Sequence, residues 1–220
     1  MITSLFINIP TRLPAGLLVG LLFLCSIQGV YANSSTIVVF GDSISAAYGM
    51  ETNLGWVNLL SERLTDHQII NASVNGETTG GGLVRLQKTL DAHQPDIVIL
   101  ELGGNDGLRG YPIDKIEANL DAMTRMSQSA GATVLLIGMV LPPNYGHRYT
   151  TAFEEVFSDI ADRFDLAFVP FILDGVATSS GLIQRDGIHP KPEAQAMILE
   201  GILPALHPLL VKTTTTLQER

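Results

Sequence analysis

Cysteine is nearly absent from this chain. Its 220 residues include one cysteine, Cys25, which lies in an apolar stretch close to the start of the sequence. Without that stretch, the chain has no thiol. This excludes disulfide bonds, a cysteine nucleophile and a cysteine-rich metal site from the rest of the protein. Its chemistry must therefore depend on other side chains.

Basic residues are also scarce. The chain has 13 lysines and arginines against 22 aspartates and glutamates, a formal charge of −9 with neutral histidines. Arg12 is the only charged residue among the first 32, so the rest of the chain is slightly more acidic. A negative surface repels the phosphates of nucleic acids and of anionic membranes. We therefore predict no nucleic-acid partner and no docking to anionic membranes through charge.

The first 32 residues have the pattern of a secretory signal peptide. An unbroken apolar run extends from Ala15 to Leu24, and Val30-Tyr31-Ala32 ends the segment where signal peptidase cuts. The alternative is a membrane anchor, but the run is shorter than the ~20 residues that a spanning helix needs. Leu24 before Cys25 argues against lipidation. The pattern predicts cleavage after residue 32, no stable membrane anchor afterwards, and a periplasmic or secreted protein.

Residues 33–212 alternate between short apolar runs and segments with helical spacing. The runs typical of strands are Thr36–Phe40, Ile69–Ala72, Asp96–Leu102, Thr133–Val140 and Leu166–Val169. Helical spacing is found in Gly55–Thr65, around Leu83–His93, Ile113–Met126 and Phe153–Phe164, and in Glu193–Leu210. This alternation predicts one α/β domain, a parallel sheet with helices on both faces. Residues 213–220 (TTTTLQER) have no periodicity and are predicted to be a disordered tail.

Two polar segments follow predicted strands directly. Gly41-Asp42-Ser43 ends the first strand, and Gly103-Gly104-Asn105-Asp106 ends the third. In open parallel sheets, ligands bind beyond the carboxyl ends of the strands. We therefore expect both segments to lie at the functional edge of the sheet.

Ser43 is the candidate nucleophile. A tight turn after the strand would expose its hydroxyl and orient nearby backbone N–H groups outward. The alternative is a serine that caps a short helix, and Gly-Asp-Ser by itself does not decide between the two.

His189 follows Asp186 by three residues, in a turn framed by Gly187 and Pro190. At that spacing a carboxylate reaches the Nδ1–H of the imidazole, which leaves Nε2 free to act as a base. The alternative is a solvated histidine. The other histidines in this part of the chain lack such a partner, and His147, in the loop 142–149, has no acid nearby.

Asn105 and Gly76 are candidate donors to an oxyanion. The Asn105 amide follows two glycines, which allow a ligand to approach the backbone closely. Gly76 follows the second predicted strand and offers a backbone N–H at the same edge. Each segment is also compatible with an ordinary turn.

The order of these elements resembles the SGNH (GDSL-type) hydrolase family over about residues 36–210. The segments VVFGDSISAAYGM, NASVNGETT, ELGGNDGLRG, LPPNYGHRY and DGIHPKPEAQ are similar to the bacterial periplasmic arylesterase branch, which includes thioesterases that also act as lysophospholipases. The resemblance implies a three-layer α/β/α sandwich with a flavodoxin-like, five-stranded parallel sheet.

The resemblance also implies roles for individual residues. Ser43 would be the nucleophile, His189 the general base and Asp186 its orienting acid. The oxyanion hole would consist of the backbone N–H groups of Ser43 and Gly76 and the Asn105 side chain. A substrate-side loop within Leu141–Tyr149 would bind substrate through Leu141, Pro142, Pro143, Asn144 and Tyr145.

The expected activity is hydrolysis of small-molecule acyl esters or thioesters through an acyl-enzyme, with no cofactor and no metal. A carbohydrate acetylesterase on the same fold is one alternative, and a non-catalytic periplasmic module that binds lipids or sugars is another. A dinuclear metallophosphoesterase is disfavoured, because the chain lacks the paired histidine and aspartate ligands that two metals need.

Overall fold

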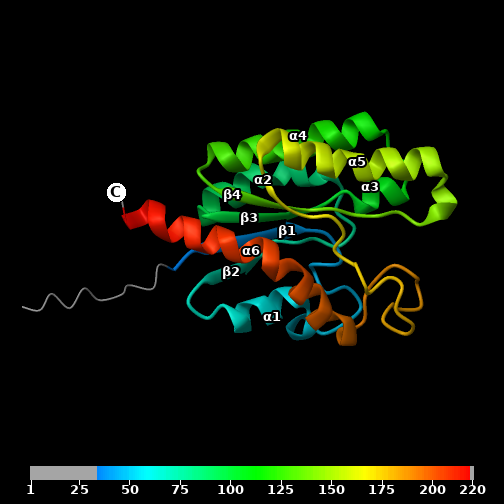
Figure 1. Ribbon diagram of the computed structural model, residues 1–220, viewed down its shortest axis with the longest axis horizontal. Coiled ribbons are helices and arrows are strands. Elements are labelled where there is room, and N and C mark those ends of the chain that lie inside the picture. The colour runs from blue at the N-terminus through cyan, green and yellow to red at the C-terminus, as the bar shows by residue number, and fades with distance from the viewer. Residues whose placement is uncertain (1–33, 219–220) are drawn as a thin grey trace, which may run out of the picture. The chain divides into compact units, whose positions relative to one another are not determined.

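The computed structural model describes residues 34–218, so the predicted signal peptide and the last two residues of the predicted tail lie outside the described residues. The described part contains one parallel sheet between two layers of helices (Figure 1). Its strands are β1 (Thr36–Gly41), β2 (Gln68–Asn71), β3 (Ile97–Glu101), β4 (Thr133–Ile137) and β5 (Ala167–Val169). The strand order is β2-β1-β3-β4-β5, and every pairing is parallel. The predicted α/β sandwich is confirmed.

The helices cover both faces of the sheet (Figure 1). One layer consists of α1 (Trp56–Arg63) and α6 (Gln195–Gln218), which pack against each other. The other layer consists of α2 (Thr79–His93), α4 (Ile113–Ser129) and α5 (His147–Phe164), with α4 between its neighbours. A short helix, α3 (Gly104–Leu108), follows β3 directly, and 3₁₀ turns lie at Thr52–Leu54, Pro143–Tyr145 and Pro192–Ala194.

Apolar side chains of the central strands form the core. Residues 37–40 of β1 and 97–100 of β3 are fully buried, as expected for strands covered on both faces. In α5 the residues with helical spacing, Phe153, Phe157 and Ile160, are buried against this core. Full burial of such side chains stabilises the fold by about 1.5–3 kcal/mol each.

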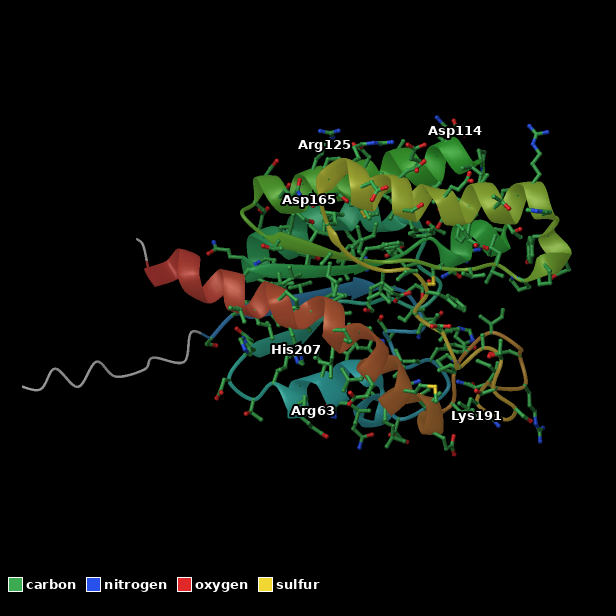
Figure 2. All side chains as sticks on the ribbon, viewed as in Figure 1. Arg63, Asp114, Arg125, Asp165, Lys191 and His207 are labelled. Atoms are coloured by element: carbon green, nitrogen blue, oxygen red, sulfur yellow. The ribbon has the colours of Figure 1, made fainter. Side chains whose placement is uncertain are left out.

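Charged side chains lie on the outer surfaces of both helical layers. Arg63 on α1, and Asp114 and Arg125 on α4, are exposed and point away from the sheet (Figure 2). The helices are therefore amphipathic in the sense that their sequence spacing predicts.

The first turn of α2 lies very close to the sheet. Thr78 caps this helix, with its Oγ1 accepting a hydrogen bond from Gly81 N–H at 3.2 Å. A Cβ atom at Gly82 would collide with Leu102 and crowd Phe40. Gly82 therefore allows the helix to pack directly on Phe40 of β1 and on Leu102, just after β3.

Several boundaries differ from the sequence prediction, most of them by one or two residues. Strand β4 ends at Ile137 and not at Val140. The loop after it is shorter than expected, because α5 already begins at His147. The residue before this helix, Gly146, has a φ of +87°, which is outside the helical range and sets the start of α5. Helix α6 continues to Gln218, past the predicted end at residue 210 and into the segment predicted to be a disordered tail.

Within residues 34–218, one helical segment, Pro192–Val211, is long and apolar enough to cross a membrane as judged by length and composition. Several of its apolar side chains, among them Ile198, Ile202 and Leu206, belong to the buried core. Its hydrophobicity is thus accounted for by packing in this fold.

Candidate active site

Ser43 lies in a tight turn directly after β1. The turn is closed by backbone hydrogen bonds from Ala46 N–H to the Asp42 carbonyl and from Tyr48 N–H to the Ser43 carbonyl, each 3.0 Å long. The Asp42 carboxylate adds a hydrogen bond from Ile44 N–H at 3.0 Å. The turn presents the Ser43 hydroxyl at the carboxyl end of the sheet, where the sequence placed it.

His189 reaches Ser43 from the segment between β5 and α6. Its Nε2 lies 2.8 Å from Ser43 Oγ, and its Nδ1 lies 2.7 Å from Asp186 Oδ2. The other Asp186 oxygen accepts the backbone N–H groups of Ile188 and His189 at 3.0 and 3.1 Å. Desolvation acts to raise the pKa of Asp186, but these hydrogen bonds and the imidazole together lower it to about 2. The carboxylate is therefore ionised at neutral pH and favours the Nδ1–H form of the imidazole.

Asn105 lies in the first turn of α3 and lines the same cavity as Ser43 and His189. Its Nδ2 donates a hydrogen bond to Asp42 Oδ2 at 3.0 Å. One amide hydrogen is thereby engaged, and the other is available for a ligand in the cavity.

Gly76 also lies in a turn, after β2, with φ of +73°. It does not line the cavity that holds Ser43, Asn105 and His189. Its carbonyl accepts a hydrogen bond from Arg109 at 3.3 Å. The role of its N–H group as an oxyanion donor stays a prediction.

The cavity beside Ser43 has a volume of about 460 Å³ and is mostly apolar. Of the predicted substrate residues, Leu141, Pro142 and Pro143 line it, whereas Asn144 and Tyr145 do not. The Tyr145 hydroxyl instead donates to the Leu108 carbonyl at 2.9 Å. Further lining residues, which the sequence reasoning missed, come mainly from the irregular segment before Asp186: Phe171, Leu173, Ala177 and Ile183. Their only sequence signal is apolar character without helical or strand spacing.

The model of the GDSL-like lipase/acylhydrolase family matches residues 39–197. The chain belongs to this family. The predicted family is thereby confirmed, and the protein is an enzyme, a GDSL-type hydrolase.

Similar proteins include three that carry the names expected from the motifs. Esterase TesA of Pseudomonas aeruginosa is 48% identical over 183 residues, which cover 81% of this chain and 91% of that protein. The arylesterase of Vibrio mimicus is 42% identical with the same coverage of both proteins. Thioesterase 1/protease 1/lysophospholipase L1 of Escherichia coli is 38% identical over 190 residues, 86% of this chain and 91% of that protein. A crystal structure of TesA matches with a TM-score of 0.78 at 47% identity, over 80% of this chain and 99% of that one.

Two further residues of this GDSL-type hydrolase, Tyr48 and Gln184, connect the histidine segment to the serine turn. The Tyr48 ring packs on the His189 imidazole, with ring centroids 4.5 Å apart. The side-chain amide of Gln184 donates to the carbonyls of Tyr48 and Pro190 at 2.9 and 3.0 Å. Gln184 N–H also donates to the His189 carbonyl at 2.8 Å. The serine turn and the histidine segment are thus joined directly, a feature for which the sequence offered no signal.

A protein metal site usually needs three or more donor side chains close together. Residues 34–218 contain no group of three or more His, Cys, Asp or Glu side chains placed to hold a metal ion. Asp186 contacts His189, and His189 in turn contacts Ser43. The arrangement is suited to activating a hydroxyl by proton transfer.

Proposed function

We propose that this GDSL-type hydrolase cleaves carboxylic esters and acyl thioesters by nucleophilic catalysis, with Ser43, His189 and Asp186 as its catalytic residues. The observation that carries the proposal is the 2.8 Å separation of His189 Nε2 and Ser43 Oγ. A general base must lie within about 2.6–3.2 Å of the proton that it takes. The names of the esterase, arylesterase and thioesterase relatives support the substrate class.

In the first step, Ser43 Oγ attacks the acyl carbon while His189 Nε2 takes the hydroxyl proton. The carbonyl oxygen becomes an oxyanion, which the Asn105 amide and the N–H groups of Ser43 and Gly76 stabilise. His189 then gives the proton to the departing alcohol or thiol, and an acyl-Ser43 ester remains. In the second step, His189 takes a proton from water as the water oxygen attacks the acyl carbon. The bond from the acyl carbon to Ser43 Oγ then breaks, Oγ recovers the proton from His189, and the acid leaves. Asp186 stays ionised throughout and stabilises the imidazolium that forms.

Labelling with a fluorophosphonate tests the nucleophile directly. We expect the purified protein to form one covalent adduct, and peptide mass spectrometry to locate it on Ser43. Activity on p-nitrophenyl acetate and octanoate, insensitive to chelators, should accompany the labelling. An adduct at another serine would contradict the assignment of Ser43 as nucleophile, and the absence of hydrolysis would favour a binding module.

The Asn105 amide is expected to contribute strongly to the transition state. Asn105→Ala should lower kcat by about 10²- to 10³-fold with little change in KM, because the oxyanion forms only after attack. Steady-state kinetics on a p-nitrophenyl ester measures the effect. Asn58→Ala is the matched control, since the Asn58 amide donates to the Asn53 carbonyl in the preceding 3₁₀ turn and to the Glu62 side chain on α1. Equal kcat values for Asn105→Ala and Asn58→Ala would show that the Asn105 amide does not stabilise the oxyanion.

We further propose that the apolar cavity binds the acyl chain, with Leu141, Pro142 and Pro143 forming part of its wall. A buried methylene contributes about 0.8 kcal/mol, so a chain that fills the cavity gains affinity with each added carbon. Among the described residues that line the cavity there is no lysine or arginine, which suits an uncharged acyl group. Any charged part of a leaving group lies outside it.

Bulk added at Ala177 tests this assignment. Ala177→Phe should reduce the octanoate-to-acetate ratio of kcat/KM by about tenfold or more, because the ring occupies space that a longer chain needs. A series of p-nitrophenyl esters measures the ratio. Val84→Phe is the matched control, at a residue of α2 that is 85% exposed. An unchanged ratio in Ala177→Phe would place the acyl chain elsewhere.

Export of the protein remains part of the proposal. The apolar segment and the Val30-Tyr31-Ala32 sequence support cleavage and a periplasmic or secreted enzyme acting on small-molecule esters. N-terminal sequencing of the exported protein tests this, with Asn33 expected as the first residue.

A further inference from the structure

Two carboxyl groups lie buried side by side beneath the serine turn, and the mechanism above uses neither. Asp42 precedes the nucleophile, and Glu101 ends β3, the strand paired with β1. Glu101 is 0% and Asp42 2% exposed. An isolated buried carboxylate is costly, so the contacts of each group decide which of them is ionised.

The two oxygens of Glu101 have different surroundings. Oε2 accepts hydrogen bonds from Ser45 Oγ at 2.6 Å and from Asp42 N–H at 3.2 Å. Oε1 is fully buried and receives no hydrogen bond from any group in residues 34–218. A Cβ atom at Gly41 would collide with Oε2. The carboxyl group is therefore packed directly against the backbone that leads to Ser43, with one oxygen that lacks a donor.

Asp42, in contrast, has donors on both oxygens. Ile44 N–H binds Oδ1 and Asn105 Nδ2 binds Oδ2, each at 3.0 Å. Such donors favour the charged form. Asp42 is thus the member of the pair that the surroundings stabilise as an anion.

The two carboxyl groups also lie within hydrogen-bonding reach of each other. Burial, and next the charge of Asp42, raise the pKa of Glu101 well above its usual value. Burial raises the pKa of Asp42 to about 6, although the Ile44 N–H and the nearby His189 act to lower it. Within residues 34–218, His189 is the further titratable group that acts on the pair. Both effects favour a proton on the pair, and the missing donor at Glu101 Oε1 favours its location on Glu101.

We propose that Glu101 is a positioning residue that stays protonated and donates its proton to the Asp42 carboxylate, which in turn holds the Asn105 amide with its NH₂ group toward the acyl oxygen. The inference rests on the proposed function for the role of Asn105. The proton on Glu101 does not depend on that function.

The orientation of the amide is the step through which Glu101 acts. An amide can turn either its NH₂ group or its carbonyl toward a neighbour. An ionised Asp42 accepts from NH₂ and repels a carbonyl oxygen, so it selects the orientation that leaves a second N–H for the oxyanion. A proton kept on Glu101 allows Asp42 to remain ionised without a second buried charge beside it.

The linkage between proton binding and stability tests the protonation state without any substrate. A glutamate that is neutral when folded and ionised when unfolded makes the unfolding equilibrium constant rise about tenfold per pH unit. This holds above the usual glutamate pKa of about 4.3 and below the raised folded value. Stability from this group is therefore lost as the pH rises. Glu101→Gln keeps a neutral donor and removes the titration.

Denaturant unfolding between about pH 5 and pH 7 provides the measurement. We expect the ratio of the wild-type to the Glu101→Gln unfolding constant to rise about tenfold per pH unit. Glu200→Gln, at a side chain that is 60% exposed, should run parallel to the wild type. Parallel curves for the wild type and Glu101→Gln would show an ionised Glu101 and overturn the proposal.

Kinetics tests the positioning role separately. Glu101→Gln should keep kcat within about threefold, because its amide still donates to Asp42, whereas Glu101→Met should lower kcat about tenfold or more with little change in KM. In an Asn105→Ala background, Glu101→Met should add little, because both changes remove the same donor. A full additional loss in that background would overturn the positioning role.

The two tests separate failure of this inference from failure of the proposed function. A Ser43→Ala protein that keeps its activity contradicts the function and leaves the linkage result intact. If Glu101→Met does not fold, Glu101→Gln still tests both the protonation of Glu101 and its positioning role. A large loss of kcat in Glu101→Gln, or a ratio of wild-type to Glu101→Gln unfolding constants that does not change with pH, contradicts the proposal.

Discussion

Replacing Ser43 by alanine is expected to reduce ester hydrolysis by about 10⁴- to 10⁶-fold, the largest effect of any single change in this protein. In the proposed mechanism the Ser43 hydroxyl oxygen forms the bond to the acyl group, and it lies 2.8 Å from His189 Nε2, the proposed base. KM should change little, because the apolar cavity proposed to bind the acyl chain stays intact. Residual turnover would come from substrate binding and the oxyanion donors alone.

The measurement is kcat on p-nitrophenyl octanoate, together with loss of fluorophosphonate labelling. Ser158→Ala is the matched control, because the Ser158 hydroxyl binds the Glu155 carbonyl within α5. The control should retain wild-type kinetics. Labelling of Ser43→Ala at the wild-type rate would mean that another residue is the nucleophile.

Replacing Asp186 by asparagine is expected to lower kcat by about 10⁴-fold. The carboxylate accepts the Nδ1 proton of His189 at 2.7 Å, whereas an asparagine amide can present NH₂ there and favour the opposite tautomer, with the proton on Nε2. That proton would block the base function toward Ser43. KM should again change little.

The effect of Asp186→Asn on stability should be small and should disappear at low pH. Because the pKa of Asp186 is lowered to about 2 in the folded protein, its stabilisation is present above the unfolded value near 3.9 and is lost as the pH falls through about 2. The side chain is 37% exposed, so solvent screens the ion pair with His189.

Thermal unfolding at about pH 7 and pH 3 separates these effects. The variant should remain folded at pH 7 while its kcat is strongly reduced. Asp174→Asn is a suitable control, since Asp174 is exposed in the same segment between β5 and α6. A loss of folding at pH 7 that matches the loss of kcat would show a structural role in place of the catalytic one.

The fold was accessible from the sequence because burial imposes a simple pattern. Strands covered on both faces must be apolar along their whole length, as in residues 97–100, and helices on a sheet must repeat apolar residues every three to four positions. The ends of helices and strands were harder to predict. Helix α5 starts at His147 because of the backbone conformation of Gly146, and apolar periodicity carries no information on that conformation.

The candidate site was partly accessible for a different reason. Ser43 and Asn105 follow strands whose carboxyl ends must share one edge of a parallel sheet, so their proximity follows from topology. The lining of the cavity could not be predicted from the sequence, because Phe171 and Leu173 belong to an irregular segment that no spacing rule describes.

By itself, the sequence determined the layers of the domain, the family and the three segments that bear reactive side chains. These depend on local pattern and on the order of elements along the chain. Only the tertiary structure decided that Gln184 joins the serine turn to the histidine segment, and that Glu101 lies beside Asp42 away from water. The physical reason is that hydrogen-bond partners and the loss of hydration depend on which distant residues meet, and a linear pattern does not contain that information.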